Sequence, residues 1–512
     1  MAEPKIAQPH PQVERLERLD TEGIPDKHAT MDAEIREYVG DSDAVDIDEA
    51  TSTRLRRMID RRVLIVMLGT YFLQSLDKNA LSFSAIMGIQ TDAHLVGQDY
   101  NWLHSIIYFG ILAAEFPTVI LVQKVPIAKY LAANIFLWGL TIAMTCFGNS
   151  FGVLMVLRIL LGIFESVSQP AFLLLSAMWY TRKEQAVIVS FWFGMNGVQG
   201  ICGGLIAYGI SHIHSHVIKS WQVLYIILGG ITCVWAVFVL WWMPDSPMRA
   251  KCWSYEDRLL MIERVRANQT GIQNRKLKRS QVIEAIKDPQ IWCYVLIQVI
   301  IQIPSGGLGS FSTIIISNFG FTSLQTDLLS MGTGFIQCCI MLGSGWLVRH
   351  YSRAIIFQML FLVPNIVGTI VLMTVPISHS TRVGLLFAYW LTMSFWGMTV
   401  ILMAAVARNV AGQTKKSVST AALFVAWAVG NIIGPQLFQS KDAPRYFTCF
   451  SVQMGCYVLD LILLSILWWY LRRENAKKDA VQVVDESAAE TNLSNAFDDL
   501  TDKENPNFRY MT

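Results

Sequence analysis

Two adjacent charged residues and an amide, Asp77, Lys78 and Asn79, lie within an otherwise apolar run from Val63 to Met87. A run of about 20 apolar residues can cross a lipid bilayer as a helix. A charge at the middle of such a helix costs roughly 2.5–3.5 kcal/mol on insertion scales. Neighbouring helical side chains point about 100° apart, so Asp77 and Lys78 cannot neutralise each other face to face. Each needs a partner on another helix, and residues of this kind typically line a path for a solute or an ion.

Three more ionisable residues lie in other apolar segments of the first half of the chain. Arg158 and Glu165 lie two turns apart on one face of the fourth segment, and Glu115 lies in the second. At about 1.5 Å per residue, Arg158 reaches the depth of Asp77 and is its expected partner. The alternative is a paired network that only holds the helices together. We predict that proton coupling uses Asp77, Glu115, Arg158 and Glu165.

The apolar segments of the second half carry amides and are nearly uncharged, apart from an isolated Asp460 in the twelfth. Gln302 lies in the seventh segment, and Asn431 and Gln436 lie in the eleventh. Amides donate and accept hydrogen bonds without the cost of burying a charge. We therefore expect ion handling in the first half and a share of solute recognition in the second. The predicted solute-binding residues are Lys78, Asn79, Arg158, Asn196, Gln302, Asn431 and Gln436.

The composition sets the class of protein that must position these residues. The chain has 512 residues, of which 53% are hydrophobic and only 16% are charged, whereas soluble domains are about 25% charged. The net charge of +2 gives no indication of a nucleic-acid partner, and the expected surroundings are a lipid bilayer. We predict an all-α membrane protein with twelve transmembrane helices, centred near Leu76, Gly110, Leu137, Phe164, Val198, Val234, Ile301, Gln337, Val363, Phe395, Trp427 and Leu461.

Polar segments divide the chain into five parts. We expect a disordered tail at 1–58, a six-helix bundle at 59–243, a partly helical linker at 244–288, a second six-helix bundle at 289–472 and a second tail at 473–512. Lys and Arg are concentrated in the linker and in alternate loops, so the positive-inside rule places both termini and the linker in the cytosol. Two six-helix halves around such a linker are typical of secondary transporters, whose solute site lies between the halves.

Other kinds of site have little support. The sequence has no nucleophile–base set, cofactor loop or Cys/His spacing of the metal-binding type, so we expect neither enzyme activity nor a cofactor or metal. His212, His214 and His216 lie in one loop without an adjacent acidic or thiol ligand, and we interpret them as solvated histidines. The polar start of the chain contains no signal-peptide pattern.

Several longer stretches resemble one family. DYNWLHSIIYFGILAAEFPT, RILLGIFESVSQPAF, MWYTRKEQ, MPDSPMRAKCWS, VGNIIGPQLF and DLTDKENPNFRY are similar to fungal members of the major facilitator superfamily, in the allantoate permease-like branch of the anion:cation symporter family. The resemblance extends from about Leu55 to the C-terminus. It implies two pseudo-symmetric six-helix bundles, alternating access, a plasma-membrane location and proton-coupled symport of a small organic anion such as allantoate, nicotinate or pantothenate. Arg158 and Gly162 match the superfamily's R-x-x-x-G motif, in which the Arg is linked to proton coupling. We expect a monomer.

The chain also departs from the superfamily pattern. The loop after the second span keeps only Lys124 and Lys129 of the usual motif, and its echo after the eighth span, GWLVRHYSR, lacks the usual Asp. We therefore expect other contacts to hold the two halves at their cytosolic ends. The fifth span lacks the Gly-Pro of drug:proton antiporters, which favours symport. The alternatives are an exporter of a fungal secondary metabolite and a nutrient sensor that does not transport.

Overall fold

The computed structural model describes residues 47–213, 218–266, 278–351, 353–484, 500–505 and 508–511. These ranges consist of helices and connecting loops, without a β-strand. Most of the predicted N-terminal tail, together with His214 and His216, lies outside the described residues.

The first half contains six membrane-length units. α3 (Glu49–Ile59) leads through a π-helical turn at Asp60–Leu64 into the first of them. Short α5 (Ile89–Asp92) follows it at the far end. The six units are α4 (Ile65–Ile86), α6 (Asp99–Lys124), α7 (Ile127–Met144), α8 (Phe151–Glu165) with α9 (Ser168–Trp179), α10 (Arg182–Ser211) and α11 (Ser220–Trp242).

The second half repeats this number of units after two linker helices, α12 (Tyr255–Arg266) and α13 (Arg279–Lys287). Its units are α14 (Pro289–Ser310) with α15 (Ser312–Asn318), α16 (Ser323–His350), α17 (Ala354–Thr374), α18 (Arg382–Thr392) with α19 (Phe395–Asn409), α20 (Gln413–Gln436) and α21 (Phe447–Val484).

The helices agree with the twelve predicted spans. Ten of these units are long and apolar enough to cross a membrane. The other two, α4 and α10, have 22 and 30 residues, which is also sufficient for a bilayer. They are more polar because α4 carries Asp77 and Lys78, and α10 carries Asn196 and Gln199.

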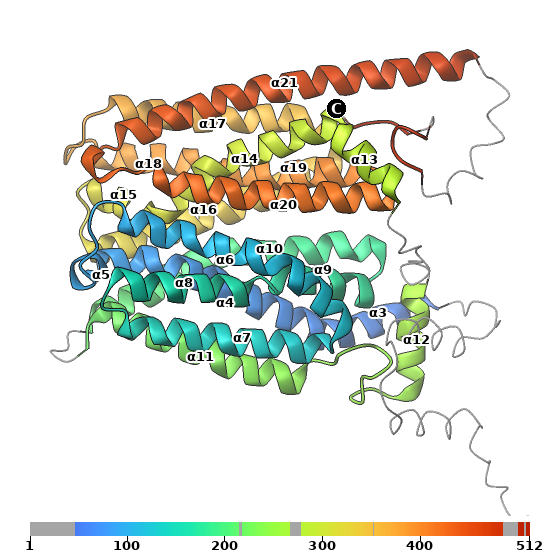
Figure 1. Cartoon of the computed structure of the whole chain (residues 1–512), viewed down its shortest axis with the longest axis horizontal. Coiled ribbons are helices and arrows are strands. Elements are labelled where there is room, and N and C mark those ends of the chain that lie inside the picture. Colours follow the sequence, from blue (N-terminus) through green and yellow to red (C-terminus); the bar gives the residue numbers. More distant parts are fainter. Residues whose placement is uncertain are drawn as a thin grey trace, which may run out of the picture.

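The helices run roughly along the long axis of the molecule, and the two halves lie side by side across it (Figure 1). They meet where α10 packs on α16 and where α6 packs on α20, and α4 contacts α14 and α15. The end of the bundle where α3, α12 and α13 lie is called the linker end below. The opposite end carries α5 and α15 (Figure 1).

Glycine permits the close approach of α10 and α16. A Cβ atom added to Gly200 would lie 2.6 Å from Cα of Gly334, which is shorter than a van der Waals contact. Gly162 of the R-x-x-x-G motif has the same role between α8 and α6, because its Cβ would lie 2.1 Å from the carbonyl oxygen of Ile107. Small residues of this kind allow membrane helices to pack closely.

Both ends of the chain are more ordered than the predicted tails. α3 begins at Glu49, within the segment predicted as a disordered tail, because Leu55 and Ile59 are buried. α21 continues past residue 472 to Val484. Residues 500–505 and 508–511 then pack back onto the second half, where Thr501 and Asp502 are fully buried.

Candidate functional site

A cavity of about 1780 Å³ lies between the two halves. Its middle is lined by side chains of α4, α6 and α10 from the first half and of α14, α16, α19 and α20 from the second. It extends to the linker end, where Lys278, Arg408, Lys416 and Phe508 are part of its wall. The cavity therefore reaches one end of the bundle.

At the opposite end, hydrogen bonds join the halves. The Asn101 amide of α6 donates to the carbonyl oxygens of Pro435 and Phe438 at 2.9 and 2.6 Å. Ser105 Oγ donates to the Ile432 carbonyl oxygen at 2.7 Å. These contacts tie α6 to the end of α20 and close the bundle at that end.

A second set of contacts completes this closure between α4 and the α14–α15 corner. Ser82 Oγ donates to the Ser310 carbonyl oxygen at 2.8 Å, and Thr313 Oγ1 donates to the Ser82 carbonyl oxygen at 2.6 Å. The ring of Tyr100, on α6 of the first half, meets that of Phe311 in the second half edge to face, with centroids 5.3 Å apart. The closure thus combines polar and aromatic contacts.

Six of the seven predicted solute-binding residues line the cavity, namely Lys78, Asn79, Arg158, Asn196, Gln302 and Asn431. Gln436 lies outside its wall and belongs to the closure, because its amide donates to Ser105 Oγ at 2.9 Å. α20 ends at Gln436, and this places its side chain beyond the middle of the bundle.

Lys78 forms an ion pair across the cavity wall. Its Nζ lies 3.4 Å from Glu165 Oε2, and the Lys78 side chain is 29% exposed while that of Glu165 is 0% exposed. Gln74 Nε2 donates to the Glu165 carbonyl oxygen at 3.3 Å. The Lys78 ammonium also lies 5.7 Å from the ring centroid of Trp427 on α20, within cation–π range. The cation thus faces the cavity and both halves, while its counter-ion is buried behind it.

Asp77 has a neutral partner. Trp138 Nε1 of α7 donates to Asp77 Oδ2 at 2.7 Å, whereas Arg158 Nη2 donates to the Tyr225 hydroxyl oxygen of α11 at 3.1 Å. Among the described residues, no ion pair joins Asp77 to Arg158, so the expected direct pair is not formed. Counting residues gives the depth of a side chain but not the direction in which it points, and α7 and α11 supply partners at the same depth.

Glu115 lies apart from Asp77 and Glu165. It lines the cavity from α6, and its buried Oε2 has no hydrogen-bond partner within the described part of the chain. Asp77 and Glu165 are each 1% exposed and lie behind the cavity wall. The four predicted proton-coupling residues therefore occupy two kinds of environment.

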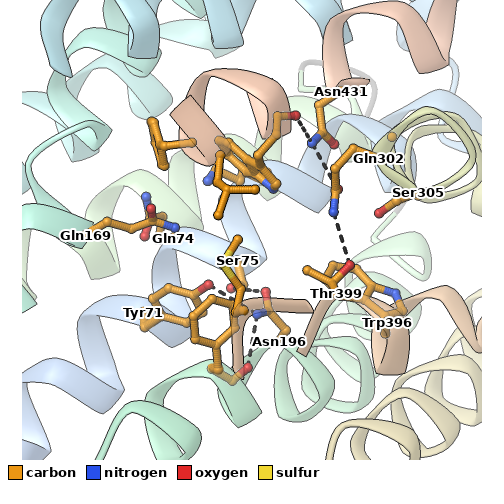
Figure 2. Close-up of a pocket in the computed structure, with 18 of the residues that line it drawn as sticks. Tyr71, Gln74, Ser75, Gln169, Asn196, Gln302, Ser305, Trp396, Thr399 and Asn431 are labelled. Carbon is orange, nitrogen blue, oxygen red and sulfur yellow. Dashed lines mark hydrogen bonds between the residues drawn. The ribbon is translucent and has the colours of Figure 1, made fainter. Parts of the chain in front are cut away.

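Two hydrogen-bonded networks of neutral side chains face each other across the cavity (Figure 2). In the second half, Asn431 donates to Gln302 Oε1 at 3.2 Å, and Gln302 donates to Thr399 Oγ1 at 3.1 Å. Tyr108 of the first half donates to Asn431 Oδ1 at 3.2 Å, so this network also bridges the halves.

In the first half, Ser75 donates to Asn196 Oδ1 at 2.9 Å, and Asn196 donates to the Tyr71 hydroxyl oxygen at 3.2 Å (Figure 2). Sequence reasoning identified Asn196 but not Ser75 or Tyr71. Tyr71 and Ser75 lie four residues apart, and so on one face of α4. Two hydroxyl groups on one face of an apolar span are the signal that could have identified these partners, because a buried hydroxyl usually has a hydrogen-bond partner.

At the linker end, the first half is held by contacts that the incomplete loop motif did not reveal. Glu184 pairs with Arg264 of the linker and lies 3.7 Å from Arg56 Nη1. The Tyr180 hydroxyl donates to Asp60 Oδ1 at 2.9 Å. Burial raises the pKa of Asp60, and the Tyr180 hydrogen bond and the Arg56 charge offset that rise only in part.

Comparison with known proteins agrees with this architecture. The model of the Major Facilitator Superfamily matches residues 67–435. The chain is 34% identical to an uncharacterized transporter of Schizosaccharomyces pombe, with 95% of this chain and 92% of that protein covered. It is 33% identical to the allantoate permease of Saccharomyces cerevisiae, with 91% and 88% covered. It is 31% identical to an MFS-type transporter of Penicillium expansum, with 92% and 90% covered.

Solved structures show the same fold at low sequence identity. A D-xylose–proton symporter superposes with a TM-score of 0.60 at 13% identity, covering 79% of this chain and 97% of that one. A bacterial homologue of the lysosomal transporter Spinster, in an inward-facing and unoccupied conformation, gives 0.58 at 13% identity, with 82% and 96% covered. The family match, the relatives and the twelve-helix fold together establish that this chain belongs to the Major Facilitator Superfamily and is a multi-pass membrane transporter of that type.

Proposed function

We propose that this transporter carries a small organic anion together with a proton, by alternating access between its two halves. The observation that carries the proposal is the Lys78–Glu165 pair, because its cation faces the cavity and its anion is buried. The similarity to an allantoate permease supports an anionic solute.

The cavity offers an anion two cations and aromatic surfaces. Lys78 and Arg158 lie in its wall, with Trp427 and Trp396 on the side of the second half. A solute carboxylate that binds the Lys78 ammonium would compete directly with the Glu165 carboxylate. The neutral networks around Asn196 and Asn431 would then bind the polar remainder of the solute.

Proton coupling follows from this competition. When Lys78 binds the solute, Glu165 becomes a buried carboxylate without its cation, and burial of an unpaired charge is strongly unfavourable. Glu165 would therefore take up a proton as the solute binds, and return it when the ion pair re-forms. Asp77 is the second candidate for this proton, because it is buried and accepts a hydrogen bond from the neutral indole of Trp138. One proton with one monoanion moves no net charge, and each pH unit then supplies about 1.4 kcal/mol.

The closed end and the open end of the bundle indicate which conformational state of the transport cycle this structure represents. By the positive-inside rule, the Lys- and Arg-rich linker supports a cytosolic linker end, so the cavity would open inward. Rocking of the halves about the middle of the bundle would break the contacts of Asn101 and Ser105 and expose the same side chains to the outside. Both termini would then be cytosolic, and the plasma membrane is the proposed location.

The test is transport into yeast cells that lack their own carboxylate transporters. Radiolabelled allantoate, nicotinate and pantothenate are offered at pH 5 and pH 7, with and without a protonophore. We expect at least one to accumulate faster at pH 5, with the protonophore abolishing accumulation. Uptake that is independent of pH and protonophore would contradict proton coupling.

A variant pair makes this test specific to the ion pair. Glu165→Gln mimics the protonated side chain, so we expect it to exchange labelled for unlabelled solute but not to accumulate solute against a gradient. Glu256→Gln changes an exposed carboxylate on linker helix α12 and is the matched control, with unchanged accumulation. Loss of exchange as well as accumulation in Glu165→Gln, with normal amounts of protein, would argue against the proton role.

Export of a larger metabolite is the second candidate. The cavity of about 1780 Å³ exceeds the roughly 300–1,000 Å³ of typical small-molecule sites, although its open end contributes to that volume. Cells loaded with labelled solute would lose it faster with the transporter than without it, and uptake would be absent at both pH values.

A further inference from the structure

The C-terminal residues 500–505 and 508–511, called the C-terminal strap below, dock at the linker end of the second half. The centre of the docking site is Lys415 of α20, which is fully buried. Its Nζ lies 2.7 Å from Asp502 of the strap and from Asp288, and 2.9 Å from Glu284. The Lys415 ammonium fills the space between three carboxylates, so this cluster binds the strap and not a metal ion.

Further contacts fix the strap along its length. The Tyr510 hydroxyl donates to Asp502 Oδ2 at 2.8 Å, and its backbone exchanges two hydrogen bonds of 2.9 Å with the Asn475 side chain. Met511 exchanges hydrogen bonds of 2.6 and 2.9 Å with the Asn409 side chain. The strap therefore contacts α19, α20 and α21, and its Lys503 Nζ lies 3.0 Å from Asp288 Oδ1, between α13 and α14.

One strap residue reaches the solute path. Phe508 is part of the cavity wall at the linker end, and it is supported by the Tyr510 ring at 5.2 Å and the Lys478 ammonium at 5.4 Å. Because this partly exposed ring lies at the open end of the cavity, it would contact the partner segment that closes this end. When the halves rock to open the opposite end, that partner is the linker end of the first half.

We infer that the C-terminal strap is a gate element, in which the Lys415 cluster anchors the segment and Phe508 seals the linker end of the cavity while the opposite end is open. The loop motif after the eighth span lacks its usual Asp, and Phe508 would supply a contact that closes the linker end from the second half. The inference requires only that the two halves alternate, and it is independent of the identity of the solute.

The docking step is tested by hydrogen–deuterium exchange of the full chain in lipid nanodiscs. We expect the amides of Tyr510 and Met511 to be protected in the unmodified protein. Asp502→Lys places a like charge against Lys415, so these amides should exchange at least tenfold faster. Lys477→Gln, an exposed change on α21 that does not contact the strap, should leave them protected. Rapid exchange in the unmodified protein would overturn the docking.

The gating step is tested by nitroxide labels on Lys124→Cys and Ser417→Cys in a cysteine-free chain, which report the separation of α6 and α20 at the linker end. We expect a long and a short distance in the unmodified protein. Phe508→Ala leaves the Lys415 cluster intact and should remove most of the short-distance population, and Asp502→Lys should do the same. Lys477→Gln should retain both populations.

An unchanged distance distribution in Phe508→Ala, with the strap still protected, would overturn the gate. Because these measurements need no solute, they remain decisive even if no carboxylate is transported. If transport is observed, Phe508→Ala should lower the maximal uptake rate about tenfold while changing the solute dissociation constant less than twofold.

Discussion

Lys78 and Asp77 are neighbours in the chain, but their surroundings differ. Lys78 faces the cavity with a buried carboxylate behind it, whereas Asp77 is buried and receives a hydrogen bond from Trp138. In the proposed mechanism, a solute that enters the cavity breaks the Lys78 pair. The Asp77 contact can change only if α4 and α7 move or if Asp77 is protonated.

The contact between Trp138 and Asp77 gives a prediction at the residue scale. Trp138→Phe removes the indole donor and leaves a buried carboxylate with one partner fewer, which should cost about 1–3 kcal/mol of stability. Asp77→Asn removes the charge, so adding it to Trp138→Phe should recover most of that loss. Thermal unfolding of both single variants and the double variant in detergent measures the coupling. Strictly additive effects would show that the two side chains do not interact.

At this scale, the signal available in the sequence was a charge that interrupts an apolar run. Lys78, Arg158 and Glu165 were identifiable because each is expensive in a spanning helix, and the structure brings Lys78 to Glu165. Trp138 and Tyr225 were not identified, because an aromatic residue in an apolar segment is the usual composition of a buried helix. The partners of Asp77 and Arg158 depend on helix rotation, which residue counting does not supply.

At the scale of elements, α4 and α10 are the two predicted spans that fall outside the helices apolar enough to cross a membrane by composition, and both line the cavity. α10 additionally forms a contact between the halves, where it packs on α16. The same helix must therefore supply Asn196 to the cavity and glycines to the interface. This dual role accounts for its lower hydropathy.

The glycine contact between α10 and α16 gives a prediction at this scale. Gly200→Leu places a side chain where even a Cβ would lie 2.6 Å from Gly334, so the helices must separate, at a typical cost of about 1–3 kcal/mol for overpacking. We expect a lower unfolding temperature and loss of transport. Gly209→Leu on the same helix is the matched control, because a Cβ there meets nothing within 4 Å. Equal effects of the two substitutions would contradict this role of Gly200.

Most elements were predictable from the sequence because twelve apolar runs of membrane length are separated by polar loops. The division of the α8–α9 and α18–α19 units was not predicted. Nor was the docked C-terminal strap, because a short polar segment such as DLTDKENPNFRY has the composition of a disordered tail. Its docking contact is made with Lys415, which lies far away in the sequence and pairs with Asp502.

At the scale of the whole molecule, the two ends of the bundle differ in how they are held. The end opposite the linker is closed by hydrogen bonds from side chains of one half to backbone carbonyls of the other, as at Asn101 and Ser105. At the linker end, the contacts described above lie within one half and its adjoining linker or tail. This arrangement is compatible with the proposed mechanism, in which each half moves as a unit while the cavity opens at either end.

The closure predicts the effect of weakening it. Asn101→Ala removes two hydrogen bonds to the end of α20, each worth about 0.5–1.5 kcal/mol, so the outward-open state should become roughly 5- to 150-fold more populated. The rate at which an impermeant thiol reagent, added outside, labels Gly309→Cys in a cysteine-free chain measures this. Asn134→Ala, which removes a hydrogen bond within α7 alone, should not change the labelling rate. A labelling rate unchanged in Asn101→Ala would contradict the assignment.

The reciprocal hydrogen bonds between Met511 and Asn409 have a practical consequence for studying this protein. A fluorescent reporter or purification tag fused to the C-terminus would disturb the Met511 backbone groups that form these hydrogen bonds. Such a fusion could traffic and purify normally while its turnover is altered. Reporters attached at the N-terminus avoid this artefact, and a comparison of the two fusions would reveal it.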